Sequence, residues 1–152
     1  MQLDRRVILL SVALYIALGI PISLLHETGH VYICETNGYH YRVWIDFTGG
    51  HMLCFGNLAD SFVYNAMGGL FGLAGSAVLV IAYFAKRHYA LLVVGLAYAV
   101  DQGAKILLEG LYARVYNSGA IDLPITALQV ASWIGFMLYF ANRSYATRPV
   151  RT

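Results

Sequence analysis

Charged residues are scarce in this chain of 152 residues, because Asp, Glu, Lys and Arg make up only 12% of it, about half the ~25% usual in soluble domains. Hydrophobic residues make up 59%, and the mean hydropathy is +0.62. Two cysteines and three prolines are too few for a disulfide scaffold or a collagen-like chain. A net charge of +2, without a basic patch, gives no indication of nucleic-acid binding. These scarcities predict one integral membrane domain, residues 1–152, whose apolar surface contacts the lipid bilayer.

Four apolar stretches are long enough to cross a hydrocarbon core of ~30 Å at ~1.5 Å per helical residue. We expect transmembrane helices over residues 7–25, 61–85, 89–113 and 123–141. The first stretch follows Arg5 and Arg6 but is longer than a typical signal-peptide core, and no small-residue cleavage site follows it. We therefore expect it to be retained.

The distribution of basic residues predicts the orientation in the membrane. Lys and Arg near the ends of the spans favour one side by seven to two, which places both chain termini in the cytoplasm. The seven are Arg5, Arg6, Lys86, Arg87, Arg143, Arg148 and Arg151, and the two on the opposite side are Arg42 and Arg114.

The segment between the first two predicted helices has the pattern of a short β-hairpin. Residues 39–47 are rich in aromatic and β-branched side chains, Thr48, Gly49 and Gly50 are typical of a turn, and residues 51–55 are largely apolar. The predicted fold class is thus an all-α membrane protein of four transmembrane helices, with a short β-hairpin between the first two.

The most specific pattern in the chain is H-E-T-G-H at residues 26–30, here called the HETGH motif. We expect the first helix to continue through it, which places His26 and His30 on one face, four residues apart. Two imidazoles at this spacing can bind one Zn²⁺, and Glu27 between them can take a proton from the activated water. The motif therefore predicts His26 and His30 as metal ligands and Glu27 as the catalytic base of a zinc-dependent hydrolase.

A catalytic zinc site usually has a third protein ligand, and two acids in the third predicted helix are candidates. Asp101 and Glu109 each lie four residues from Lys105, so both could instead form an ion-paired ladder within one helix. Counting from the cytoplasmic ends of the helices, His26 and Glu109 each lie about 20 residues in, ~30 Å along the helix, whereas Asp101 lies about 12 residues in. The residues alone therefore leave Asp101 and Glu109 nearly level as candidates.

Taken together, these features resemble the small members of the site-2 protease family of intramembrane zinc metalloproteases, over residues 7–140. The resemblance rests on the HETGH motif at the end of an apolar helix, the β-rich loop before a glycine-rich second helix, and an Asp, here Asp101, within the third helix. It implies Zn²⁺ bound by His26, His30 and Asp101, whereas the comparison of helical depth keeps Glu109 as the alternative third ligand. It also implies an endopeptidase in which Glu27 activates water to cleave a transmembrane segment of a membrane-spanning protein substrate.

A second hypothesis belongs to a different functional class. The chain is short, so it could be a non-catalytic, metal-binding accessory subunit of a larger membrane complex, a degenerate relative of the enzymes. Cys34 and Cys54 both fall on the non-cytoplasmic side of the predicted topology and could pair, although two cysteines do not by themselves establish a disulfide.

Overall fold

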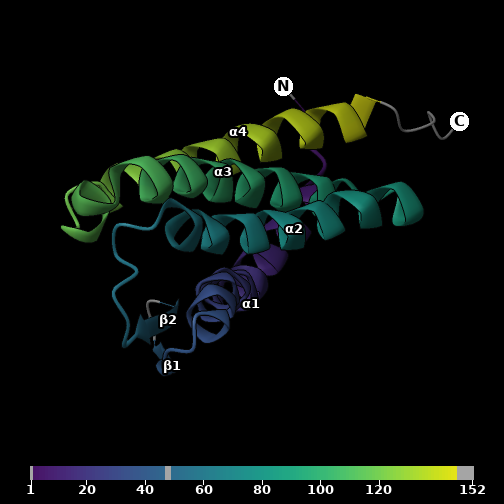
Figure 1. Ribbon diagram of the computed structural model, residues 1–152. Coiled ribbons are helices and arrows are strands. Elements are labelled where there is room, and N and C mark those ends of the chain that lie inside the picture. Colours follow the sequence, from purple (N-terminus) through teal and green to yellow (C-terminus); the bar gives the residue numbers. More distant parts are fainter. Residues whose placement is uncertain (1, 47–48, 147–152) are drawn as a thin grey trace, which may run out of the picture.

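The computed structural model describes residues 2–46 and 49–146, and within them four helices and two strands (Figure 1). In chain order the elements are α1 (Arg5–Thr36), β1 (Tyr41–Asp46), β2 (Gly49–Cys54), α2 (Phe62–Lys86), α3 (Tyr89–Asn117) and α4 (Asp122–Ala146). The predicted fold class is confirmed, because all four helices are long and apolar enough to cross a membrane and the strands form one antiparallel hairpin between α1 and α2. Residues 47–48 of the predicted hairpin and the basic residues 148 and 151 lie outside the described residues.

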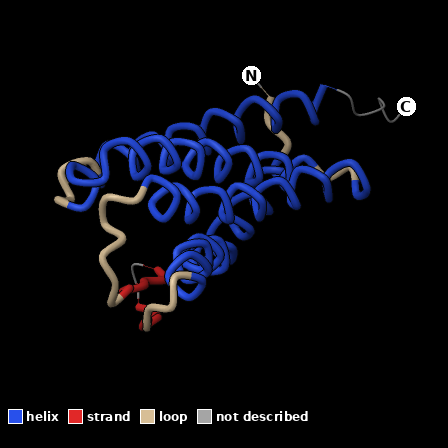
Figure 2. The backbone as a smooth tube through the Cα atoms, in the orientation of Figure 1, coloured by secondary structure: helices blue, strands red, loops and turns tan. Residues whose placement is uncertain are grey.

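The helices are arranged as a three-helix layer with α1 across it. Helices α2, α3 and α4 lie side by side, and α1 crosses them at a steep angle, so that its C-terminal end is seen nearly end-on in Figure 1. The hairpin is the only described β-structure and lies beside that end of α1 (Figure 2). This arrangement brings the end of α1 close to the N-terminal half of α2.

Local capping chemistry explains where several helices begin and end. The Asp4 carboxylate accepts a hydrogen bond from the Arg6 amide at 3.0 Å, and the Ser61 hydroxyl accepts one from the Tyr64 amide at 3.3 Å, so each satisfies an amide that the first helical turn leaves free. Arg87 adopts a left-handed conformation with φ 53°, which stops α2 and allows α3 to begin at Tyr89.

The two ends of the described chain are tied together. The Asp4 amide donates to the Ala141 carbonyl at 3.0 Å, and the Ser144 hydroxyl donates to the Asp4 carboxylate at 2.7 Å. The start of α1 and the end of α4 therefore lie at the same end of the bundle, as an even number of membrane spans requires.

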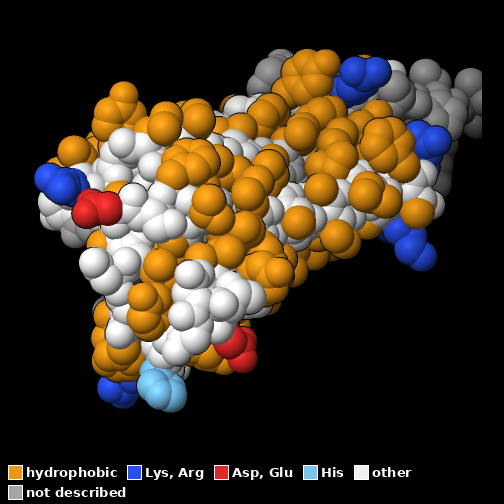
Figure 3. Space-filling model, viewed as in Figure 1, with side chains coloured by type: hydrophobic (Ala, Val, Ile, Leu, Met, Phe, Trp, Pro, Cys, Tyr) orange, Lys and Arg blue, Asp and Glu red, His pale blue; other side chains and the backbone are white. Residues whose placement is uncertain are grey.

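Large apolar side chains cover the outside of the bundle. Leu9, Ile16, Ile81 and Leu123 are each at least two-thirds exposed, which would be costly in water and is expected where the surroundings are lipid. In Figure 3 the middle of the visible face is apolar, and its charged side chains gather at the helix ends and on the hairpin. The chain is thus a multi-pass membrane protein.

Candidate metal centre

The HETGH motif lies within α1, as predicted, and projects both histidines towards α2 and α3. His26 is 5% exposed and His30 is 9% exposed, and their Nε2 atoms lie 3.1 Å apart. The four-residue spacing on a continuous helix accounts for this convergence, because residues i and i+4 share a face.

Two glycines allow α1 and α2 to approach closely at this point. A Cβ atom at Gly29 would collide with the Met67 carbonyl group, and one at Gly68 would collide with the Nε2 atoms of both imidazoles. The backbone of α2 therefore forms one wall of the histidine site, and a side chain on either glycine would push the helices apart or displace the rings. The sequence indicates that the second helix is glycine-rich, but not that these glycines face the histidines.

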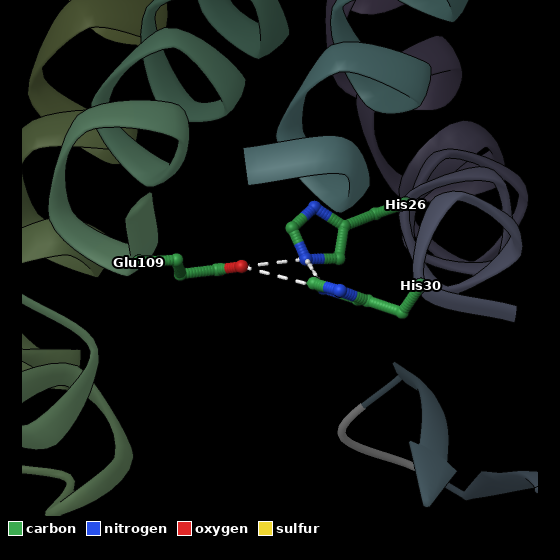
Figure 4. A group of neighbouring side chains, drawn as sticks. All are labelled: His26, His30 and Glu109. Carbon is green, nitrogen blue, oxygen red and sulfur yellow. Dashed lines mark hydrogen bonds and ion pairs between the residues drawn. The ribbon is translucent and has the colours of Figure 1, made fainter. Parts of the chain in front are cut away.

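The acid that joins the histidines is Glu109 of α3 (Figure 4). Its Oε1 lies 3.4 Å from His26 Nε2, and its Oε2 lies 3.3 Å from His30 Nε2. Glu109 is 4% exposed, so all three side chains are shielded from solvent. We call His26, His30 and Glu109 the His-His-Glu group.

Asp101, which the resemblance implies as third ligand, does not lie with the histidines. It is eight residues before Glu109, a rise of ~12 Å along a helix, and its Oδ2 pairs with Lys105 Nζ at 3.3 Å. It also lines a different cavity, of about 440 Å³. The structure therefore selects Glu109, the acid at the same helical depth as the motif, over Asp101. Of the predicted ladder Asp101–Lys105–Glu109 it contains the first pair.

The chemistry of the His-His-Glu group fits a bound cation. His26 Nδ1 hydrogen-bonds with Gln102 Oε1 at 2.9 Å, and His30 Nδ1 with the Tyr64 carbonyl at 2.8 Å. Since these acceptors require a proton on each Nδ1, a neutral imidazole presents its Nε2 lone pair to the other ring and to the carboxylate. Lone pairs from two rings and a carboxylate, converging in a buried space, repel one another unless a positive charge lies between them.

The spacing within the group also suits a tetrahedral metal ion. Two ligand atoms each ~2.0–2.1 Å from a tetrahedral zinc are about 3.3 Å apart. Here the two Nε2 atoms are 3.1 Å apart, one Glu109 oxygen lies 3.4 Å from His26 Nε2, and the other lies 3.3 Å from His30 Nε2. The structure therefore shows a buried group able to hold a metal ion, whose donors are those that zinc commonly takes.

A cavity of about 750 Å³ opens beside the group, between the hairpin and the helices. Glu27 lines it together with the His-His-Glu group, and Lys105 lines both this cavity and its smaller neighbour. Glu27 is thus placed on the same cavity as the predicted ligands without being one of them.

The hairpin closes another side of this cavity. Its residues from Gly50 to Cys54 line the space, and a disulfide between Cys34 and Cys54 fixes β2 to the end of α1. The pairing that the sequence left open is therefore present in the structure. Cys34 lies four residues after His30, so the covalent link anchors the hairpin one helical turn from the site.

Two further residues hold the imidazoles. Tyr64 acts through its backbone carbonyl and Gln102 through its side-chain amide. The first contact has no sequence signal, since every residue carries a carbonyl. The second had a weak one: Gln102 is a polar residue next to Asp101 in a membrane span, but nothing in the sequence indicates that it faces α1.

Comparisons with known proteins do not assign a family to this chain. Searches against protein-family models, curated proteins and solved structures found no match. What the structure establishes is a four-helix membrane fold that buries two histidines and a glutamate, positioned to hold a metal ion.

Proposed function

We propose that this protein is a zinc-dependent intramembrane endopeptidase that cleaves membrane-spanning segments. The observation that carries the proposal is that the buried His-His-Glu group and Glu27 line one cavity at the end of the membrane-spanning helix α1. The two neutral imidazoles and the carboxylates of Glu109 and Glu27 together carry two negative charges, which a divalent cation would neutralise. Neutrality matters in a membrane, where an unbalanced charge costs several kcal/mol.

Each residue has a defined role in the proposed reaction. His26, His30 and Glu109 bind the metal, and Glu27 accepts a proton from the attacking water and passes it to the leaving amine. A bound zinc ion would polarise the scissile carbonyl and lower the pKa of water to about 7. The side chains come from α1 and α3, and the backbone of α2 packs against the two histidines.

The hairpin supplies a place for an unwound substrate. The Phe55 amide donates to the His40 carbonyl, so these two opposite residues form a hydrogen-bonded pair. Along antiparallel strands such pairs alternate with pairs whose main-chain groups point away from the partner strand, and in this register the second kind includes the pairs made by Gly50, Met52 and Cys54. The main-chain groups of Gly50, Met52 and Cys54 therefore face the outer edge of β2. Ser23 already hydrogen-bonds with both main-chain groups of Gly50.

The edge at Met52 and Cys54 borders the large cavity. A transmembrane helix must break its internal hydrogen bonds before its backbone can be cleaved, and in lipid the freed groups need new partners. Strand addition to this part of β2 would provide them.

Replacing Glu27 tests the proposal. We expect Glu27→Gln to keep its bound zinc but to lose peptidase activity by about 10²–10⁴-fold, because the amide cannot accept a proton. Activity would be measured on a panel of labelled single-span peptides in proteoliposomes, and zinc on the same preparations by mass spectrometry. Glu35→Gln is the matched control, since Glu35 is exposed on the same helix. Zinc-loaded wild-type protein that cleaves none of the peptides would reject the proposal, as would a Glu27→Gln variant that cleaves normally.

The accessory-subunit hypothesis has one observation in its favour. All six residues of β1 are exposed, and Val43, Trp44 and Ile45 are apolar residues 40–54% exposed, a surface that suits a protein partner or the membrane interface. Co-purification with other membrane proteins at a fixed stoichiometry, with zinc bound and no peptidase activity, would select this alternative.

The orientation in the membrane is part of the proposal. The excess of Lys and Arg puts both termini in the cytoplasm, so the hairpin and the disulfide lie on the opposite side of the membrane. Disulfides persist in oxidising compartments and are rare in the cytosol, so the Cys34–Cys54 bond supports the same orientation independently.

Thiol labelling in cells tests this orientation. These are the only two cysteines of the chain, so a maleimide–polyethylene glycol reagent should attach to none before reduction and to both after it. Cells quenched in acid and analysed by gel shift give the measurement. Two labels attached without reduction would show reduced thiols and contradict the predicted orientation.

A further inference from the structure

A chain of four polar side chains runs from His26 away from the proposed metal. His26 Nδ1 contacts Gln102 Oε1 at 2.9 Å, Gln102 Nε2 donates to Asp101 Oδ2 at 2.8 Å, and Lys105 Nζ lies 3.3 Å from the same Oδ2. Gln102 is 1% exposed and Asp101 is 2% exposed. Neither Gln102 nor the Asp101–Lys105 pair has a role in the reaction proposed above.

The chemistry of these groups sets the direction of every hydrogen bond. A carboxylate facing a lysine ammonium accepts only, so the Gln102 amide must turn its NH₂ group towards Asp101. Its oxygen then faces His26, and that oxygen can accept only. His26 must therefore carry its proton on Nδ1, which leaves the Nε2 lone pair directed at His30 and Glu109.

Packing prevents Gln102 from taking another position. A Cβ at Gly72 of α2 would collide with the Gln102 side-chain amide, so the glutamine fills the space that this glycine leaves. A glutamine packed this tightly cannot turn its amide without breaking its bond to Asp101. The Asp101–Lys105 ion pair thus fixes the Gln102 amide, and the Gln102 amide fixes the orientation of the His26 ring.

We propose that Gln102 is a positioning residue for the metal, oriented by Asp101 and Lys105, and that it holds His26 in the tautomer that binds zinc through Nε2. This inference rests on the metal binding in the proposed function but not on proteolysis. It gives Asp101 a purpose without making it a ligand. Partners of this kind typically change metal affinity by about 10–100-fold when removed.

The test compares metal affinities of purified protein in detergent. Gln102→Met keeps a side chain of similar length but removes the acceptor, and we expect the dissociation constant for Zn²⁺ to rise by about 10–100-fold. The Co²⁺-loaded variant should also show a shifted visible absorption band, because the orientation of one imidazole ligand changes. Gln129→Met is the matched control: Gln129 lines the neighbouring cavity with Asp101 but lies on α4, and its variant should bind Zn²⁺ as the wild type does.

A swap variant separates positioning from packing. Asp101→Asn with Gln102→Glu exchanges the two functional groups while keeping one carboxylate, so the new Glu can accept from His26 and the new Asn can donate to that Glu. Lys105 is a quarter exposed and can turn to the moved charge. We expect the swap to bind Zn²⁺ at least about tenfold more tightly than Gln102→Met does. Where Gln102→Met does not fold, the swap is compared with the wild type: a dissociation constant within about tenfold of the wild type supports the positioning role, and a larger one overturns it.

The outcomes are distinct. A Gln102→Met affinity within about threefold of wild type, an equal loss in Gln129→Met, or a folded swap variant that binds no better than Gln102→Met would overturn the positioning role. Wild-type protein that binds no Zn²⁺ would overturn both this inference and the proposed function. Zinc binding that follows the expected order in a protein without peptidase activity would reject the proposed function alone.

Discussion

Glu109→Gln is expected to raise the dissociation constant for Zn²⁺ by more than ~100-fold. Substituting a residue that only contacts a metal ligand typically changes metal affinity by no more than that. The physical reason is that the carboxylate of Glu109 contacts both Nε2 atoms at 3.3–3.4 Å and supplies the negative charge of the His-His-Glu group. A neutral amide is a poor zinc ligand. Zinc content after dialysis and a competition titration would measure the effect.

Zinc binding by Glu109→Gln is compared with zinc binding by Asp101→Asn, because Asp101 is the other candidate for the third ligand. Asp101 pairs with Lys105 and Gln102 rather than with the histidines, so its loss should raise the dissociation constant by no more than about 100-fold, and saturating Zn²⁺ should still fill the site. The opposite order, with Asp101→Asn losing stoichiometric zinc and Glu109→Gln keeping it, would restore Asp101 as the third ligand. Unchanged zinc binding in both variants would show that neither acid of α3 is a metal ligand.

Gly68→Ala should abolish metal binding although no ligand is altered. Its methyl group would lie 2.7 Å from His26 Nε2 and closer still to His30 Nε2, within the space where the donor atoms converge. Overpacking of this kind also costs about 1–3 kcal/mol of stability, so the melting temperature of the metal-free protein should fall. A zinc titration and a thermal melt in detergent measure the two effects.

Gly103→Ala is the matched control for Gly68→Ala. It makes the same substitution within α3, but apart from the neighbouring residues and backbone of its own helix, no described atom lies within 4 Å of the added Cβ. Zinc binding should stay at the wild-type value, and the melt should be unchanged or higher, because alanine is favoured over glycine in a helix by up to ~1 kcal/mol. Equal losses of zinc in the two variants would mean that the effect of Gly68→Ala is not local to the histidines.

The expected helix boundaries differ from the observed ones mainly at the C-terminal ends of the helices. For the first helix we expected an apolar span over residues 7–25 that continues through the motif at residues 26–30, and α1 runs further, over Arg5–Thr36. A helix that extends beyond its apolar stretch continues as long as capping and packing support it. The fourth helix likewise runs to Ala146, beyond its apolar stretch.

The sequence by itself determined the membrane class, the number of spans, the hairpin between the first two and the pairing of His26 with His30. These follow from local physical chemistry: apolar length against bilayer thickness, turn residues, and the i, i+4 geometry of a helix. The close approach of α1 to α2 could also be anticipated from the glycines, although their contact with the imidazoles could not.

Only the tertiary structure decided which acid meets the histidines. Asp101 and Glu109 lie on one helix and have the same sequence relation to Lys105, so local rules treat them alike. The choice depends on where α1 crosses α3 and on how far α3 is shifted along its own axis relative to α1. This position brings Glu109 next to the two histidines and leaves Asp101 beside Gln102 and Lys105. Those quantities arise from packing between elements far apart in the chain, which no pattern within one helix records.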